Sequence, residues 1–172
     1  EKIEKGAVVV TTPKGEVLTL LSKPSFDPNL FTLPSALLKE GDGGYPTLFS
    51  VLEDTQKQPL LNRAIGGAYP PGSTFKLVVA AAGLEKGEIN EDYIVEDNGT
   101  INIGAFSFSN WFFTQYGKTE GPVDVVKGIA RSNDIFFYKA AEKIGVEQIS
   151  SAALNFGLGK TLGIDIVGEE RG

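Results

Sequence analysis

Residues 69–87 read YPPGSTFKLVVAAAGLEKG, and this stretch decides how the chain folds. Two prolines and a glycine interrupt regular backbone just before Ser73, and an apolar run follows as far as Leu84. Apolar residues fall on every side of the helix that this run predicts. We therefore expect a helix that is buried all round, begins near Ser73 and ends at Gly87.

Ser73 and Lys76 stand three residues apart at the start of this helix, and two interpretations are open. In the first, Ser73 caps the helix and Lys76 is a solvated neighbour. In the second, Ser73 is a nucleophile and Lys76 its base, because residues three apart share a helix face and burial disfavours the charged amine. The Ser73 N–H would then suit an oxyanion. A Ser-x-x-Lys motif alone is too short to decide.

Composition excludes several classes of protein. The chain has 172 residues, of which 41% are hydrophobic, as expected for one domain with a core. Its net charge of −6 is spread without long runs of one sign, so we expect no nucleic-acid partner. Cys and His are both absent, which excludes Ser-His-Asp triads, Cys nucleophiles and zinc sites built on Cys or His. No stretch approaches the roughly 20 apolar residues of a membrane span.

The order of predicted elements indicates an α/β protein. Residues 6–12 and 17–22 predict a β-hairpin, and residues 89–111 short strands or turns. Helices are predicted over 33–39, 47–56, 122–130, 134–145 and 147–157, with a glycine-rich loop from 159 to 172. We divide the chain into a sheet hairpin and loop (1–28), a linker with short helices (29–68), and the nucleophile helix with a helical subdomain (69–172).

Four stretches together resemble one protein family. They are GAVVVTTPKGEVLTLLSKPSFDPN (6–29), PLLNRAIGGAYPPGSTFK (59–76), ARSNDIFFYKAAEKIG (130–145) and FGLGKTLGIDIVGE (156–169). This ordered set resembles the transpeptidase domain of class B penicillin-binding proteins, most closely the PBP2-like, elongation-type members. The resemblance implies the penicillin-binding-protein/β-lactamase-like transpeptidase fold, an antiparallel sheet plus an all-helical subdomain, incomplete in this chain.

The resemblance also implies roles for particular residues. Ser73 would be the acylated nucleophile, Lys76 its base, and Ser132 a relay that passes a proton toward the leaving amine. Asp134 takes the third position of the second motif, where the family usually has Asn, and would hydrogen-bond Lys76 and substrate. A carboxylate there favours the ammonium form of Lys76 and opposes its role as base. Asn133 is the alternative for substrate binding, although a helix cap at Ser132 or Asn133 explains the same letters.

The third motif of the family, K-T-G, does not occur in the 172 residues. Lys160 lies in GKTLG, between the second and third motifs of the family, and we interpret it as structural. The sequence begins with Glu1 and contains no Met, so we expect an excised piece of a longer protein. Alone it should acylate with penicillin very slowly or not at all. Its hairpin edge should pair with another copy or with a segment outside this sequence, or the hairpin should be kept only by packing on helices.

The activity that the resemblance implies is D,D-transpeptidation of peptidoglycan through an acyl-serine. Stem peptides would be the substrates, β-lactams the inhibitors and wall-synthesis membrane proteins the partners, with no metal or organic cofactor. The parent would be membrane-anchored by an N-terminal segment, with this domain on the extracytoplasmic (periplasmic) face. A serine β-lactamase or β-lactam sensor of the same fold is one alternative, and a non-catalytic fragment is another.

Overall fold

A computed structural model of the protein describes residues 3–33 and 44–172. The chain divides into two compact units, one formed by residues up to Tyr69 together with Thr161–Gly172, the other by Pro70–Lys160. Residues 161–172, which the sequence-based division assigned to the helical part, therefore group with the N-terminal hairpin.

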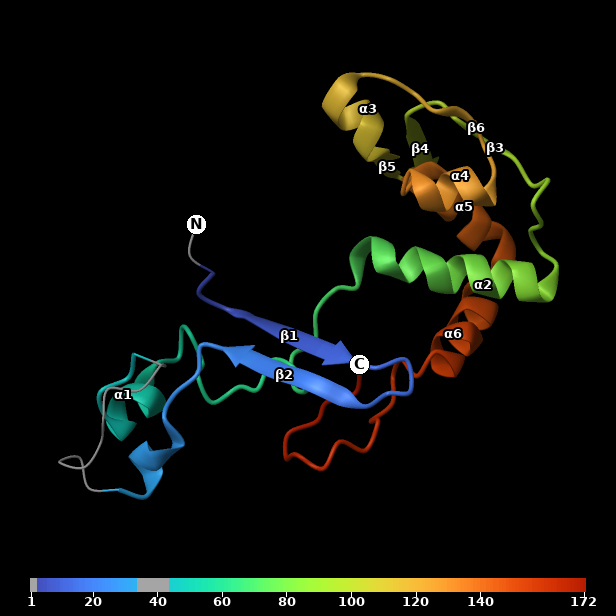
Figure 1. Ribbon diagram of the computed structural model, residues 1–172. Helices are drawn as coiled ribbons and strands as arrows, with labels where there is room; N and C mark the ends of the chain where they lie inside the picture. Colours follow the sequence, from blue (N-terminus) through green and yellow to red (C-terminus); the bar gives the residue numbers. More distant parts are fainter. Residues whose placement is uncertain (1–2, 34–43) are drawn as a thin grey trace. The chain divides into compact units, whose positions relative to one another are not determined.

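The first unit is built on the predicted hairpin, which is confirmed. Strand β1 (Gly6–Thr11) pairs antiparallel with β2 (Val17–Lys23), and Val9 lies opposite Leu20 (Figure 1). Thr12 closes the turn, since its N–H donates to Glu16 O at 2.9 Å and its carbonyl accepts from Gly15 N at 3.0 Å. Gly15 has φ of +88°, which explains the glycine at this position.

The rest of the first unit is short helices and extended chain. Helix α1 (Leu48–Glu53) lies within the helix predicted over 47–56 and begins with a capping box between Thr47 and Ser50. A short 3-10 helix occupies Pro28–Phe31. The helix predicted over 33–39 falls almost entirely outside the described residues.

Tyr45 and Asp54 bracket α1. The Tyr45 hydroxyl donates to Asp54 Oδ2 at 2.7 Å. Burial, followed by this bond, raises the pKa of Tyr45 to about 12.

The second unit is organised around α2 (Lys76–Lys86), which packs against α4, α5 and α6. Helix α2 ends at Gly87, whose left-handed φ of 71° lets its N–H bond the last carbonyls. The prediction of burial on every side was wrong, because Leu77 is 55% and Leu84 44% exposed. The neighbouring helices of this unit cover only part of the circumference of α2.

Helices α4, α5 and α6 lie in the last third of the chain (Figure 1). Helix α4 (Val125–Ala130) begins at Asp124, whose carboxylate accepts from Lys127 N. Helices α5 (Asp134–Ile144) and α6 (Val146–Asn155) match the predicted ranges closely. The core of the unit consists of buried apolar side chains from α2, from these helices and from the chain between them: Val78, Val79, Ala80, Ala82, Ile89, Val95, Ile101, Val123, Val125, Ile135, Phe136, Phe137, Ala140, Ile144 and Ala152.

The second unit also contains short antiparallel strands, and three of them lie within residues 89–111, where the sequence predicts short strands or turns. Strand β3 (Val95–Asp97) pairs with β6 (Gly121–Val123), and β4 (Thr100–Ile103) pairs with β5 (Phe106–Ser109). A helix that was not predicted, α3 (Trp111–Tyr116), follows β5. Residues 122–123 were expected to begin α4, but they extend β6 because a helix here starts only after its cap at Asp124.

Candidate active site

Ser73 lies on a tight turn that feeds directly into α2. Gly72–Phe75 form a 3-10 turn after the two prolines, and the Ser73 carbonyl accepts from Lys76 N, the first residue of the α-helix. Gly72 has φ of +58°, a conformation that other residues rarely adopt. The Ser73 side chain is exposed, as a nucleophile must be to meet a substrate.

The Lys76 ammonium meets three acceptors, two on Ser132 in the loop before α5 and one on Asp134, the first residue of α5. Its Nζ lies 2.6 Å from Asp134 Oδ1, 2.7 Å from the Ser132 carbonyl oxygen and 3.1 Å from Ser132 Oγ. The Lys76 and Asp134 side chains are 14% and 29% exposed, so this ion pair is largely shielded from water. The structure thus brings together Lys76, Ser132 and Asp134, as the second-motif alignment predicted.

Ser73 is not hydrogen-bonded to Lys76 in this arrangement. We expected Ser73 Oγ within hydrogen-bond reach of Lys76 Nζ, yet among residues 44–172 the Nζ atom bonds only to Ser132 and Asp134. An ammonium has three donors, and the three acceptors beside α5 match them. The local spacing of Ser73 and Lys76 on one chain segment is therefore overridden by a partner 58 residues away.

Asn133 has a different place from the one expected of a substrate-binding residue. It is fully buried, its Oδ1 accepts from Phe136 N at 2.8 Å and its Nδ2 donates to Asp97 Oδ2 at 2.7 Å. Both ends of its amide are therefore occupied inside the protein, which corrects the assignment to substrate. The cap interpretation describes Asn133, the N-cap of α5.

Sequence reasoning missed two buried polar residues, Asp97 and Asn110, each 1% exposed. Asp97 ends β3 and Asn110 precedes α3. The Asp97-Asn-Gly99 letters are typical of a turn and gave no sign of burial. Arg131 was also missed, and its guanidinium lies over the rings of Trp111 and Phe112, at 5.4 and 5.2 Å from the centroids.

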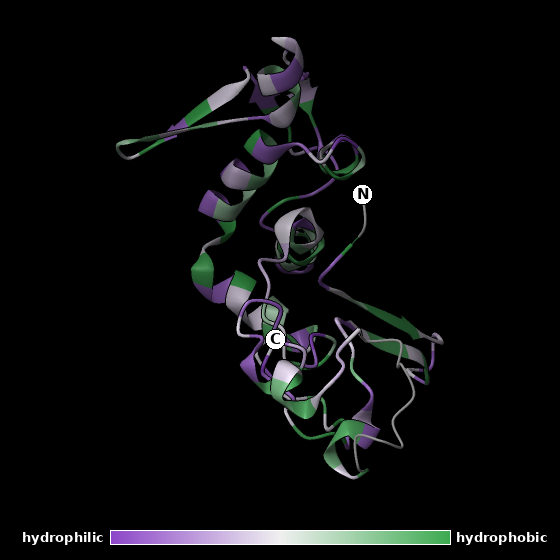
Figure 2. Cartoon of the chain, turned by 90° about the vertical axis from the view of Figure 1, so that its left-hand side faces the viewer, coloured by the Kyte–Doolittle hydropathy of each residue, from purple (hydrophilic) through white to green (hydrophobic). Residues whose placement is uncertain are grey.

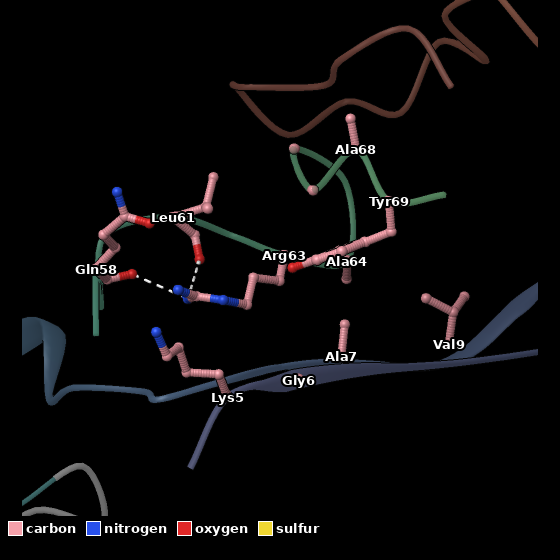
Figure 3. A pocket seen from close by; sticks show the side chains of 12 residues that line it. Lys5, Gly6, Ala7, Val9, Gln58, Leu61, Arg63, Ala64, Ala68 and Tyr69 are labelled. Carbon is pink, nitrogen blue, oxygen red and sulfur yellow. Dashed lines mark hydrogen bonds between the residues drawn. The ribbon is translucent and has the colours of Figure 1, made fainter. Parts of the chain in front are cut away.

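A separate pocket of about 660 Å³ lies in the first unit, between the start of β1 and residues 58–69 (Figure 3). The buried Arg63 guanidinium beside it donates to the carbonyl oxygens of Lys57, Gln58 and Leu61, at 2.6, 3.0 and 3.4 Å. Figure 3 shows the last two of these bonds. Arg63 therefore organises its own loop, which explains a buried cation that forms no ion pair within residues 3–33 and 44–172.

In the described part of the chain, no three His, Cys, Asp or Glu side chains gather as a metal site would need. No helix of that part combines the length and apolar character required to cross a membrane.

A family of known proteins matches nearly the whole chain, including the Ser73 turn and the loop at Ser132. Residues 6–172 match the model of the penicillin binding protein transpeptidase domain. This chain belongs to the penicillin-binding protein transpeptidase family. It carries the Ser-x-x-Lys motif of the family at the start of α2, and Ser132 and Asp134 contact the lysine of that motif.

Individual relatives of this transpeptidase domain agree. The peptidoglycan D,D-transpeptidase MrdA of Acinetobacter baumannii is 36% identical over 171 residues, which cover 98% of this chain and 24% of MrdA. The crystal structure of Pseudomonas aeruginosa PBP2 in complex with WCK 5153 superposes with a TM-score of 0.77 at 35% identity, covering 98% of this chain and 36% of that one.

A complex between PBP2 and MreC from Helicobacter pylori gives a TM-score of 0.80 at 29% identity and covers 98% of this chain and 29% of that one. The chain spans about a quarter of the length of the curated relatives it matches.

Proposed function

We propose that this chain carries the acylation site of a serine-type peptidoglycan D,D-transpeptidase. The observation that carries the proposal is Lys76, which stands one helical turn after Ser73 and is bonded to both Ser132 and Asp134 at 2.6–3.1 Å. The A. baumannii relative is named a peptidoglycan D,D-transpeptidase, which supports the reaction. Its alignment with this chain, at 36% identity over 171 residues, includes the positions of both motifs.

In the proposed reaction Ser73 Oγ attacks the carbonyl carbon of the penultimate D-Ala of a stem peptide. The Ser73 proton passes to the neutral amine of Lys76, and the Ser73 N–H stabilises the oxyanion. The C–N bond then breaks, and Ser132 relays a proton to the departing D-Ala amine. An amine of a neighbouring stem then attacks the acyl carbon and forms the cross-linking C–N bond. The bond from that carbon to Ser73 Oγ breaks, and a proton from the amine returns to Oγ through Lys76.

β-Lactams would acylate the same oxygen by opening their ring. The PBP2 structure that resembles this chain is named as a complex with WCK 5153. We further propose an extracytoplasmic site of action, since cross-links form in the wall outside the cell membrane. The MreC complex of the H. pylori relative, and a related peptidoglycan synthase complex, support partners among wall-synthesis proteins.

Labelling with fluorescent penicillin tests the nucleophile. In the full-length protein, Ser73→Ala should abolish labelling and leave the melting temperature unchanged, because the exposed hydroxyl makes no hydrogen bond among the described residues. Ser151→Ala, at an exposed serine of α6, is the matched control and should still label. Labelling of Ser73→Ala at the wild-type rate would refute the assignment.

The same proposal predicts how the 172-residue chain behaves when it is tested alone. They contain the first two motifs and no K-T-G. Without the strand that carries K-T-G, the chain should lack the second donor to the oxyanion. Loss of a single oxyanion donor costs on the order of 10² to 10³ in rate, so we expect slow labelling or none. Stoichiometric labelling of the chain within minutes, seen by intact mass, would show that the first two motifs suffice.

A further inference from the structure

Asp97 is a carboxylate buried behind the second motif, and nothing above gives it a role in the reaction. It is 1% exposed at the end of β3, which packs against α5. Its Oδ1 accepts from Gly99 N at 2.7 Å, and its Oδ2 accepts from Asn110 Nδ2 and Asn133 Nδ2, both at 2.7 Å. All three partners are N–H donors, the arrangement that suits an acceptor-only carboxylate.

Charge compensation does not explain Asp97. Among residues 3–33 and 44–172, no Lys or Arg forms an ion pair with it. A buried carboxylate without a cation is retained at a cost in desolvation, and its three hydrogen bonds must offset that cost. Such a group therefore points to a function beyond stability.

The amides bonded to Asp97 continue to the residues on either side of Asn133. Asn133 joins Ser132 to Asp134 in the chain, and its Oδ1 fixes the first turn of α5 through Phe136 N. Asn110 Oδ1 lies 3.4 Å from the Asp134 N–H. The backbone at 133 and 134 is thus held by two amides whose orientation the Asp97 carboxylate sets.

Ser132 needs such support because its backbone is left-handed. Its φ is +51°, a conformation that non-glycine residues adopt only where surrounding contacts impose it. This conformation turns both the carbonyl and the Oγ of Ser132 toward Lys76 Nζ, at 2.7 and 3.1 Å. A shift of the loop would move these contacts and the Asp134 carboxylate together.

We propose that Asp97 is a positioning residue for acylation: through Asn110 and Asn133 it holds Ser132 and Asp134 against Lys76. It touches neither substrate nor Ser73, and it acts by fixing the donor and acceptor directions of the two amides. The inference rests on the proposed transpeptidase function and adds a residue that the motifs of the family do not contain.

The test uses Asp97→Asn in the full-length protein. This change keeps the shape of the side chain but replaces one of its two acceptor oxygens with an NH2 donor, which must face either the Gly99 N–H or the Nδ2 groups of Asn110 and Asn133. The double variant Asp97→Asn/Asn133→Asp restores a donor–acceptor pair with the charge unchanged, and a carboxylate at 133 still caps α5. Ile144→Val or Ile144→Ala, whichever matches the loss of melting temperature, is the control, because Ile144 is buried at the far end of α5.

Acylation by fluorescent penicillin is resolved into its apparent dissociation constant and its first-order rate constant. Asp97→Asn should lower the rate constant about 10²-fold, the scale for misplacing catalytic groups by an ångström. The dissociation constant should change little, and the Ile144 control should keep its rate. The double variant should recover most of the rate.

Three results would overturn the proposal. They are an Asp97→Asn rate equal to that of the Ile144 control, a double variant that regains melting temperature without rate, and a loss confined to the dissociation constant. If Asp97→Asn does not fold, Asn110→Ala carries the test, since it leaves Asp97 two of its three donors. It should slow acylation about 10-fold, and an unchanged rate would overturn the proposal. Failure of the wild type itself to acylate Ser73 would instead refute the proposed function.

Discussion

The Lys76 ammonium has three N–H groups, and three acceptor atoms of Ser132 and Asp134 lie around it. In this arrangement it donates hydrogen bonds to them. Its Nζ lies closest to Asp134 Oδ1, at 2.6 Å. To take the Ser73 proton the amine must first lose one of its own, and the carboxylate that holds the ammonium is also the nearest base for it. The departure from Asn to Asp at position 134 is therefore the chemical question of this site.

Asp134→Asn answers that question. An amide keeps an acceptor toward Lys76 but removes the negative charge, which favours the neutral amine. If the carboxylate only replaces the usual amide, acylation measured at low pH should be kept or raised. A fall of about 10² or more, the scale for losing a positioned catalytic group, would show that the charge itself is required. Asp92→Asn, an exposed change of the same charge, is the control.

Ser132 allows strain and chemistry to be separated. Ser132→Ala and Ser132→Gly both remove the Oγ that lies 3.1 Å from Lys76 Nζ, but only glycine adopts φ of +51° without strain. Both variants should lose the same rate of acylation by penicillin. Ser132→Gly should be the more stable by about 1 kcal/mol in denaturant unfolding. A faster acylation by one of the two would mean that backbone conformation, and not the hydroxyl, limits the step.

At the scale of elements, the site depends on how closely α4 and α5 approach. A Cβ at Gly128 in α4 would lie 2.9 Å from Cδ1 of Phe136, a fully buried residue of α5. The Gly128 carbonyl also accepts from Asn133 N at 2.9 Å. Glycine at this position brings together the two helices whose connecting loop carries Ser132.

Gly128→Ala should destabilise the protein despite the better helix propensity of alanine. Overpacking a core costs about 1–3 kcal/mol, which exceeds the gain of about 1 kcal/mol from replacing a helical glycine. Denaturant unfolding measures the difference. Ser151→Ala, at an exposed position of α6, improves propensity without a clash and should be neutral or slightly stabilising. Equal stability of Gly128→Ala and wild type would show that Phe136 can move aside.

At the scale of the whole molecule, the hairpin exposes apolar side chains, and no third strand pairs with its edge in the described part of the chain. In the part of the chain that the structure describes, its sheet has two strands, and Val8, Val9 and Val10 are 52%, 49% and 44% exposed. Figure 2 shows much of the hairpin at the hydrophobic end of the scale. A β-branched, apolar strand edge is a template for further pairing.

The 172-residue chain should therefore self-associate, and Val10→Lys should weaken this association. A charge on an edge strand opposes pairing with a second copy. Sedimentation velocity over a range of protein concentrations measures the effect. Val126→Lys is the matched control, since it removes a 66% exposed valine from α4, and it should leave the association unchanged. A monomer at all concentrations would show that the hairpin edge is already protected.

Local patterns in the sequence were sufficient for the hairpin, for α5 and α6, and for the place of Ser73 before α2. Each depends on neighbours within a few residues, such as turn glycines, caps and apolar periodicity. The resemblance to transpeptidases added the link between Lys76 and the loop at Ser132. The resemblance placed Asp134 at the third position of the second motif but left the role of Asn133 open, because asparagine suits a helix cap and a substrate contact equally well.

Only the tertiary structure decided which polar groups are buried and which atoms Lys76 bonds. The Lys76–Asp134 pair joins residues 58 apart, and Asn133 reaches Asp97 across 36 residues. Such contacts depend on the packing of α2, α5 and β3 around one core, and no local preference encodes that packing. The sequence by itself determined that a serine and a lysine share a helix start. The fold determined that the lysine turns to Ser132 and Asp134, because their three acceptors satisfy its ammonium in a site largely shielded from water.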